Sequence, residues 1–373
     1  MGLPPRRATV KKNPMTRYKG LERPFKPDWQ AWIDNIRRKG TPRRVHQVEF
    51  WHDVEIVDAI VERFDLARGL AANAPDFFRK RLIAVQRFLG FDFVNVPLLG
   101  VDCELSYISV EDKARKDGKR AFIEEHAGPI TCWEDFEKYP WPDVSKPSAT
   151  ADLEWFQENL PQDMCIIGHT GQFAEYLCWL MGYETLCLAL YDQRDLVEAI
   201  ATKLKEYNQA SMRRILQFDR VKAVCAGDDM GFRGGLMFSP ADMRRYVLSG
   251  HKVLARMAHD AGRVYLLHSC GKLADIIPDL IDDVKLDGKH SFEDTIQDCR
   301  DAKNAWGRKM AMLGGIDVDF LCRGDEPAIR ARVRDTLDKC LPGGGYCLGT
   351  GNSAANYIPV ENYLAMIDEG RLY

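Results

Sequence analysis

The sequence predicts an α/β protein folded as a (β/α)8 barrel, the TIM-barrel architecture. Short apolar segments with strand character alternate with segments whose apolar residues recur at helical spacing, a pattern that indicates a buried parallel sheet. Eight such strands can be counted, and polar residues gather where they end, as active-site residues do in barrel enzymes. An open doubly wound sheet is the alternative, although no Gly-x-Gly-x-x-Gly turn or Walker A loop favours nucleotide binding.

Each strand is predicted from an apolar run that stops at glycine or polar residues, and each helix from apolar spacing and end signals. Ser239, Pro240 and Asp242 mark one helix start, with a capping serine, a proline in the first turn and an acid after it. The predicted strands span residues 44–51, 91–97, 164–169, 223–226, 264–270, 284–290, 311–316 and 346–349. The main predicted helices span residues 54–68, 76–89, 152–159, 173–181, 183–191, 195–218, 240–261, 326–340 and 360–369.

The domain organisation follows from composition. Residues 1–40 are basic and proline-dotted, and they are predicted to form an N-terminal arm with one short helix over residues 27–39. Residues 41–373 are predicted to form a single barrel domain. After the second strand, residues 101–150 form a polar insertion, which is expected to hold a pair of β-ribbons and a loop.

Composition excludes several classes of protein. With 46% hydrophobic and 29% charged residues, the chain has the makeup of a soluble globular protein. Its net charge of −3 gives no support for nucleic-acid or membrane-surface binding, and no apolar run is long enough to span a bilayer. The basic N-terminus has no apolar core after it, so no secretory signal is expected. Eleven cysteines, mostly in apolar runs, favour a cytoplasmic protein with reduced thiols.

The strongest chemical signal is the strand that ends on His268 and Cys270. Residues two apart in a strand face the same side, so the imidazole and the thiol are expected to point together at the carboxyl end of the strand. Such a pair is half of a zinc site, because zinc takes nitrogen and sulfur ligands. The alternative is a histidine that caps a loop beside a core cysteine.

Cys347, on the last strand, is the predicted third metal ligand. In a closed barrel the last strand and the fifth converge on one mouth, and three protein ligands would leave a fourth position open, as in catalytic zinc sites. His290, Glu293 or Asp229 could replace Cys347, which could equally be a buried strand cysteine.

Other strand ends supply candidate catalytic residues. Glu49 is predicted as an acid–base group, His169 and Asp229 as residues that orient the substrate, and His290 as a further catalytic residue.

Candidate substrate-binding residues lie at the same strand ends. Trp51 could contact an aromatic substrate, and Asn352 lies in the glycine-rich rim after the last strand. Asp228 precedes Asp229 in a glycine-flanked turn, and adjacent residues face opposite sides, so only one of them should point into the pocket. The alternative is that both acids cap the next loop.

From about residue 41 to its end, the chain resembles the uroporphyrinogen decarboxylase superfamily. The marks are LLHSCG at residues 266–271, DLIDDV at 279–284, GGID at 314–317 and GGGYCLGTGNS at 343–353. The resemblance implies a TIM barrel independently of the strand count.

The superfamily holds two broad activities. One is decarboxylation of uroporphyrinogen without a cofactor, and the other is methyl transfer by zinc enzymes that work with a methylated corrinoid protein. Decarboxylases carry an Arg-x-x-Gly-Arg-like stretch after the first strand, where this chain reads EFWHD at residues 49–53. That acidic, aromatic stretch is a poor receptor for a polycarboxylate, whereas His268 and Cys270 match the zinc branch, whose later cysteine would fall nearer Gly351 than Cys347.

The expected function is therefore a zinc-dependent methyltransferase. It would move a methyl group between a corrinoid protein or a methylated small molecule and a thiol- or amine-type acceptor. The corrinoid is expected on a partner protein, because the chain has no Asp-x-His-x-x-Gly motif. A metal-independent decarboxylase acting on a smaller carboxylated substrate is the first alternative, a non-catalytic binding protein is the second, and a homodimer is left open.

Overall fold

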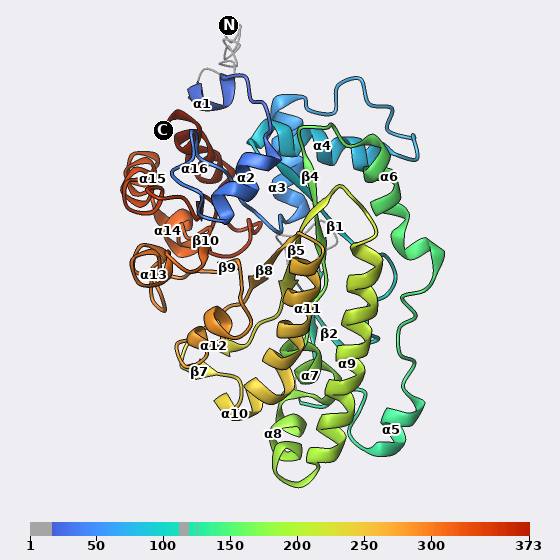
Figure 1. Ribbon diagram of the computed structural model, residues 1–373. Helices are drawn as coiled ribbons and strands as arrows, with labels where there is room; N and C mark the ends of the chain where they lie inside the picture. The colour runs from blue at the N-terminus through green and yellow to red at the C-terminus, as the bar shows by residue number, and fades with distance from the viewer. Residues whose placement is uncertain (1–16, 112–118, 125) are drawn as a thin grey trace, which may run out of the picture.

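The computed structural model describes residues 17–111, 119–124 and 126–373, and its centre is a curled, parallel sheet of seven strands (Figure 1). Neighbouring strands in the sheet follow one another in the chain, apart from the small hairpins, and every pair is parallel. This arrangement confirms the predicted TIM-barrel class. The strands are β1 (Phe93–Pro97), β4 (Cys165–His169), β5 (Val221–Gly227), β8 (Val264–His268), β9 (Gly288–His290), β10 (Ala311–Leu313) and β11 (Tyr346–Cys347).

The predicted first strand is present only as a short bridge that almost closes the barrel. The Val48 amide donates to the Leu348 carbonyl at 2.8 Å, and the Leu348 amide donates to the His46 carbonyl at 2.9 Å. On the other side, the Asn95 side-chain amide of β1 donates to the Glu49 and Phe50 carbonyls, each at 3.1 Å. A side chain thus makes the link that a strand ladder would otherwise make, which is why the strand is shorter than predicted.

Helices surround the sheet (Figure 1). The helix start predicted at Ser239 is confirmed, because its hydroxyl accepts from the Asp242 amide at 3.1 Å. Several short helices of the structure lie outside the predicted ones. The helices are α3 (Val54–Phe64), α4 (Phe77–Leu89), α6 (Ala151–Asn159), α7 (Ala174–Met181), α8 (Tyr183–Asp192), α9 (Arg194–Ile215), α10 (Pro240–Asp242), the π-helical η3 (Met243–Leu248), α11 (Ser249–Asp260), α12 (Ile277–Asp282), α13 (Cys299–Trp306), α14 (Val318–Arg323), α15 (Glu326–Cys340) and α16 (Val360–Leu372).

The insertion after the second predicted strand holds one β-hairpin rather than a pair of ribbons. Strands β2 (Tyr107–Glu111) and β3 (Lys119–Ile123) pair antiparallel, and their connection, residues 112–118, lies outside the described residues. Helix α5 (Trp133–Lys138) and the 3-10 helix η2 (Pro147–Thr150) complete it. A second small hairpin, β6 (Gly231–Phe232) with β7 (Gly235–Leu236), follows β5.

Helix α2 (Trp29–Ile36) closes the amino-terminal end of the barrel. The Arg37 guanidinium, just after it, donates to the Gly262 carbonyl ahead of β8, and the Asn35 amide donates to the Tyr346 carbonyl at the start of β11. The Trp32 side chain on the same helix is fully buried. With the amino-terminal end covered, the active site is expected at the carboxyl ends of the strands, as in other barrels of this type.

Helix α1 (Lys19–Glu22) is tied to the C-terminal helix. The Gly20 and Leu21 amides donate to the buried Asp368 carboxylate of α16 at 2.6 and 3.0 Å. Residues 1–16 of the predicted arm lie outside the described residues, and the division into an arm and a single barrel domain stays a prediction.

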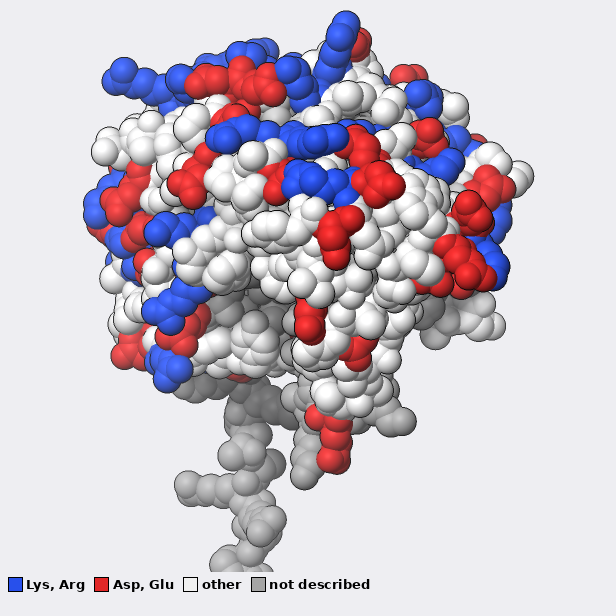
Figure 2. Space-filling model, turned by 90° about the horizontal axis from the view of Figure 1, so that it is seen from below, with Lys and Arg blue, Asp and Glu red and all other residues white. Residues whose placement is uncertain are grey.

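The surface carries charges of both signs. Figure 2 shows one face, from below, on which Lys and Arg side chains are interspersed with Asp and Glu. Within the described part of the chain, none of the helices combines the length and the apolar character needed to cross a bilayer.

The contact between α2 and β11 gives a first prediction. Asn35→Ala leaves the buried Tyr346 carbonyl without the amide donor that lies 2.7 Å away. We expect the free energy of unfolding to fall by about 1–3 kcal/mol, measured by urea denaturation. The control is Asp34→Ala on the same helix, where a half-exposed carboxylate pairs with Lys39 and the change should stay within about 0.5 kcal/mol. Equal losses in the two variants would show that the Asn35 contact does not hold α2 in place.

Candidate active site

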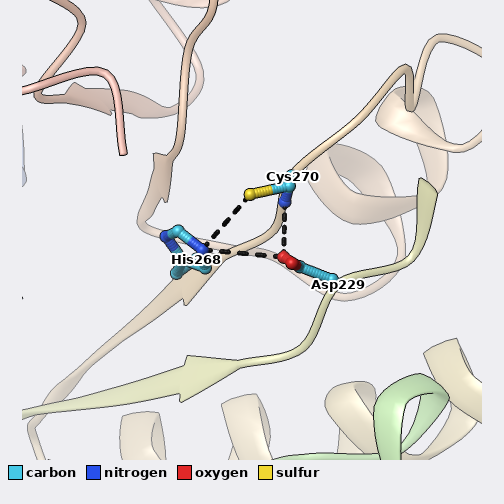
Figure 3. A group of neighbouring side chains, drawn as sticks. All are labelled: Asp229, His268 and Cys270. Atoms are coloured by element: carbon cyan, nitrogen blue, oxygen red, sulfur yellow. Dashed lines mark hydrogen bonds and ion pairs between the residues drawn. The ribbon is translucent and has the colours of Figure 1, made fainter. Parts of the chain in front are cut away.

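Three side chains that can bind a metal converge at the carboxyl ends of β5 and β8 (Figure 3). One ligand atom from each of Asp229, His268 and Cys270 lies within 4.8 Å of the other two. The His268 Nε2 atom is 3.5 Å from the Cys270 Sγ atom and 3.6 Å from the Asp229 Oδ1 atom. The Cys270 amide donates to the same Asp229 oxygen at 2.7 Å, which fixes the carboxylate against the turn.

The strand register explains how two sequence-distant segments form this cluster. Gly227 of β5 pairs with His268 of β8, so Asp229 and Cys270, each two residues further on, leave their strands side by side. The chain then turns sharply at Gly271, whose φ is +81°. A Cβ atom there would lie 2.2 Å from the Gly231 carbonyl carbon, so a larger residue would push the turn away.

A second histidine fixes the tautomer of His268. The Nδ1 atoms of His268 and His290 are 2.7 Å apart, and His290 Nε2 lies 3.3 Å from the Thr350 carbonyl oxygen. A carbonyl can only accept, so His290 carries its proton on Nε2, and His290 Nδ1 accepts from His268 Nδ1. Burial lowers the pKa of His290 to about 3 and that of His268 well below its usual value, so both rings are neutral. His268 therefore presents an unprotonated Nε2 to Cys270 and Asp229.

Burial dominates the electrostatics of the cluster. It raises the pKa of the Cys270 thiol to about 12, and it raises the pKa of Asp229 above its usual value. Lys289 is the nearby cation, and burial lowers its pKa to about 8. Its ammonium donates to the Ser269 and Ser291 carbonyls at 3.2 and 2.8 Å. A nitrogen, a sulfur and a carboxylate oxygen that face one another in a partly buried cluster, in which the Asp229 side chain is 31% exposed, form a donor set that suits a cation such as zinc.

Further polar groups surround the thiol. The Asn352 side-chain amide donates to Cys270 Sγ at 2.9 Å, and the Ser291 hydroxyl lies 3.7 Å from the same atom. Asn352, predicted from sequence as a substrate-binding residue, thus lies directly on the cluster.

A cavity of about 490 Å³ opens beside the cluster, and Trp51 stands between the two. The Trp51 ring centroid is 4.7 Å from that of His268 and 6.0 Å from that of His169. Both Trp51 and His169 line the cavity, as does Asn95, whose side-chain Oδ1 atom is 3.1 Å from His169 Nε2. The roles predicted for Trp51 and His169 remain predictions, but both residues are in reach of a bound molecule.

Cys347 does not join the cluster, which corrects its assignment as the third ligand. Its side chain is fully buried, and its Sγ atom lies 3.4 Å from the Asn35 side-chain nitrogen of α2, the helix that closes the opposite end of the barrel. Although Cys347 is the second of the two residues of β11, its thiol is directed toward α2 and not toward the mouth of the barrel. Asp229, one of the alternatives weighed from sequence, holds the position next to His268 and Cys270.

Asp228 is a structural residue rather than a substrate-binding one. Its fully buried carboxylate accepts from the Phe173, Ala174 and Glu175 amides at 3.0–3.1 Å, and it lies 2.8 Å from His251 Nε2. It therefore caps the amino end of α7, while its neighbour Asp229 faces the cluster. The inference that only one of the two acids points into the site agrees with this arrangement.

Glu49 also lies away from the site. Its side chain is fully buried, and the Thr350 hydroxyl and amide donate to its carboxyl oxygens at 2.9 and 3.3 Å. It is absent from the described residues that line the cavity, so it cannot act directly on a substrate there. Similarly, His290 contacts His268 rather than open space, which makes it a positioning residue.

Sequence reasoning missed Asn95 and Thr350. Asn95 interrupts the apolar run of β1, and a polar side chain in a buried strand is a signal that could have been used. Thr350 contributes a carbonyl, which no residue type reveals.

The curled parallel sheet, with titratable side chains at the carboxyl ends of its strands, defines a barrel enzyme of the TIM type. The family model for uroporphyrinogen decarboxylase (URO-D) matches residues 121–373. The chain therefore belongs to the uroporphyrinogen decarboxylase family. Among curated proteins, no sequence matches the chain.

Solved structures support the fold. A methyltransferase from Methanosarcina mazei is similar with a TM-score of 0.65 and 17% identity, over 93% of this chain and 98% of that one. Two further structures have TM-scores too low to carry an argument. One, described as a vitamin-B12-independent methionine synthase from Listeria monocytogenes, has a TM-score of 0.44 and 15% identity, over 88% of this chain and 94% of that one. The other, a B12-independent methionine synthase from Shewanella sp. W3-18-1, has a TM-score of 0.45 and 11% identity, over 89% and 94%.

The burial of Glu49 predicts a pH dependence of stability. Burial raises the pKa of Glu49 well above 4.5, its ordinary value, so ionising it in the folded state costs free energy. This cost grows as the pH rises through the ordinary carboxyl range, because the unfolded chain ionises first. Glu49→Gln cannot ionise, so its free energy of unfolding relative to wild type should increase between pH 4.5 and about pH 8. Urea denaturation at both pH values measures this.

The matched control is Glu137→Gln, at an exposed side chain of α5, where the difference from wild type should be independent of pH. A constant difference for Glu49→Gln as well would contradict a protonated Glu49 in the folded protein.

Proposed function

We propose that the protein is a zinc-dependent methyltransferase of the uroporphyrinogen decarboxylase family. It would move a methyl group between a corrinoid protein or a methylated small molecule and a thiol- or amine-type acceptor. The observation that carries the proposal is the convergence of His268 Nε2, Cys270 Sγ and an Asp229 oxygen within 4.8 Å of one another.

The ligand set has the character of a catalytic zinc site. Such sites use three protein ligands and keep a fourth position open for water or substrate. His268, Cys270 and Asp229 would hold the ion, and Asp229 replaces the later cysteine that the family resemblance implied. Bound zinc would hold an incoming thiol as a thiolate or polarise a methylated substrate.

The remaining residues prepare the ligands and the substrate. His290 keeps the lone pair of His268 Nε2 directed at the cluster. The Asn352 amide holds the sulfur in place. Trp51 and His169 would orient the substrate from the adjacent cavity.

The methyl partner is proposed to be a separate corrinoid protein that docks at the carboxyl end of the barrel. The likeness to a protein named a methyltransferase agrees with this reaction class, and none of the described residues that line the cavity beside the cluster is a lysine or an arginine that could pair with a carboxylated substrate. None of the eleven cysteines, all of which lie in the described part of the chain, forms a disulfide, which favours a reducing compartment such as the cytoplasm.

Metal analysis tests the proposal. Protein purified without chelator should contain about one zinc per chain, and both His268→Ala and Cys270→Ser should lose most of it. Cys132→Ser, at an exposed thiol, and Cys347→Ser, at the buried thiol near α2, should keep the wild-type content. The zinc proposal would be rejected if the wild-type protein contained negligible zinc, or if Cys270→Ser kept the full zinc content of the wild type. Activity that survives when His268→Ala and Cys270→Ser are combined in one protein would favour the metal-independent decarboxylase.

The role of His290 can be measured separately. His290→Phe keeps a ring against Phe50, whose centroid is 5.2 Å away, but it removes the hydrogen bond to His268. Apparent zinc affinity, measured by competition with a chromophoric chelator, should fall about 10- to 100-fold. His126→Phe, at a side chain that is 84% exposed, is the control. Unchanged affinity in His290→Phe would show that the second imidazole does not orient the first.

A further inference from the structure

The cavity beside the cluster has the size of a small-molecule site. Its volume of about 490 Å³ falls within the range of about 300–1,000 Å³ that is usual for such sites. It lies over the carboxyl ends of β1, β4 and β5 and extends to α3 and α4 through Val57 and Leu82. Trp51, which is 39% exposed, offers it an aromatic surface.

The lining has no fixed positive charge. Of the described residues that line the cavity, none is a lysine or an arginine. Its two histidines, His52 and His169, are neutral at pH 7, because burial lowers the pKa of each to about 4. The acid Asp102 lies at the exposed rim, where water screens it. A carboxylate or phosphate would therefore lose its hydration without gaining a cationic partner.

Two lining side chains, Gln86 and Ser211, each have a buried polar atom without a hydrogen-bond partner in the described part of the chain, and of these the Gln86 oxygen can only accept. Gln86 on α4 is 3% exposed, and within the described part of the chain its Oε1 atom has no hydrogen-bond partner. A buried amide oxygen of this kind costs free energy unless a ligand donates to it. Val85, Leu82 and Val57 beside it are apolar, so the donor would arrive on an otherwise apolar molecule.

We infer that this cavity binds an uncharged aromatic small molecule that carries one hydroxyl or amine N–H donor. The inference rests on the proposed function and deepens it, because this molecule would be the small-molecule methyl donor or acceptor. Its ring lies against Trp51, and its donor group faces Gln86.

Trp51 is the wall shared by the cavity and the metal cluster. Its indole lies over Gly227, where a Cβ atom would come within 3.2 Å of the Trp51 Cζ2 atom. The same indole meets the His268 imidazole edge-on. A molecule stacked on Trp51 is thus separated from His268 by the indole ring, and it approaches the metal cluster past the edge of that indole.

Two probes with the same ring system and different charge test the inference. At pH 7, 2-naphthol is neutral and donates one hydrogen bond, whereas 2-naphthoate is an anion. Isothermal titration calorimetry on the purified protein should show 2-naphthol binding at least about tenfold more tightly. Because a carboxylate can bind a metal directly, the same pair is compared in Cys270→Ser, where the preference should persist.

Placing a cation in the cavity should reverse the selectivity. Leu82→Lys supplies a partner for the carboxylate and should tighten 2-naphthoate binding by at least about tenfold. Pro97→Lys, at the exposed rim of the same cavity, is a second route should Leu82→Lys fold poorly. Leu188→Lys, on α8 at a side chain that is 62% exposed, is the matched control and should change neither affinity.

Two further variants test the hydrogen bond to Gln86 and the contact of the ring with Trp51. Gln86→Leu should remove the preference for 2-naphthol over 2-methylnaphthalene, which has no donor. Trp51→Ala should weaken both compounds and leave the zinc content unchanged.

Two results would overturn the inference. One is that 2-naphthoate binds as tightly as 2-naphthol both to the wild type and to Cys270→Ser. The other is that the wild type shows no binding of 2-naphthol at concentrations up to about 1 mM. A failed zinc analysis with intact 2-naphthol selectivity would instead reject the proposed metal chemistry alone, so the two failures are distinguishable.

Discussion

The site depends on one chain of hydrogen bonds, from His268 through His290 to the Thr350 carbonyl. The carbonyl can only accept, and that single constraint fixes the protons on both imidazoles. It leaves His268 with a free lone pair at the end of β8, next to a thiol and a carboxylate. Three neighbouring regions of the barrel, around β8, β9 and the turn after β11, must keep their register for this to hold.

The two adjacent acids after β5 show how neighbouring positions acquire different roles. Asp228 accepts three backbone amides at the start of α7 and contacts His251, so its charge is used within the fold. Asp229 points the other way and accepts a single amide, that of Cys270. One residue therefore anchors a helix beneath the mouth, while the next leaves an oxygen free for a ligand.

Metal cluster and cavity are distinct environments that share Trp51. On one side of the indole the groups are titratable and suited to a cation. On the other side, apart from Asp102 at the rim, the lining combines apolar and aromatic side chains with neutral polar ones, among them the unpartnered Gln86 oxygen. This division suits a reaction in which one group is activated by charge while the rest of the substrate is held by burial.

The sequence by itself determined the barrel class, because alternating apolar strands and amphipathic helices leave few other ways to bury both faces of a parallel sheet. It also brought His268 and Cys270 together at the carboxyl end of a strand, although β8 ends at His268 and Cys270 lies in the turn that follows. Local patterns could not show how far up the barrel each strand end reaches. Only the tertiary structure therefore decided that the Cys347 thiol is directed toward α2, that Glu49 is enclosed by Thr350, and that Asp229 completes the cluster. These outcomes depend on strand stagger and on contacts between residues that are far apart in the chain, and neither is encoded in any single segment.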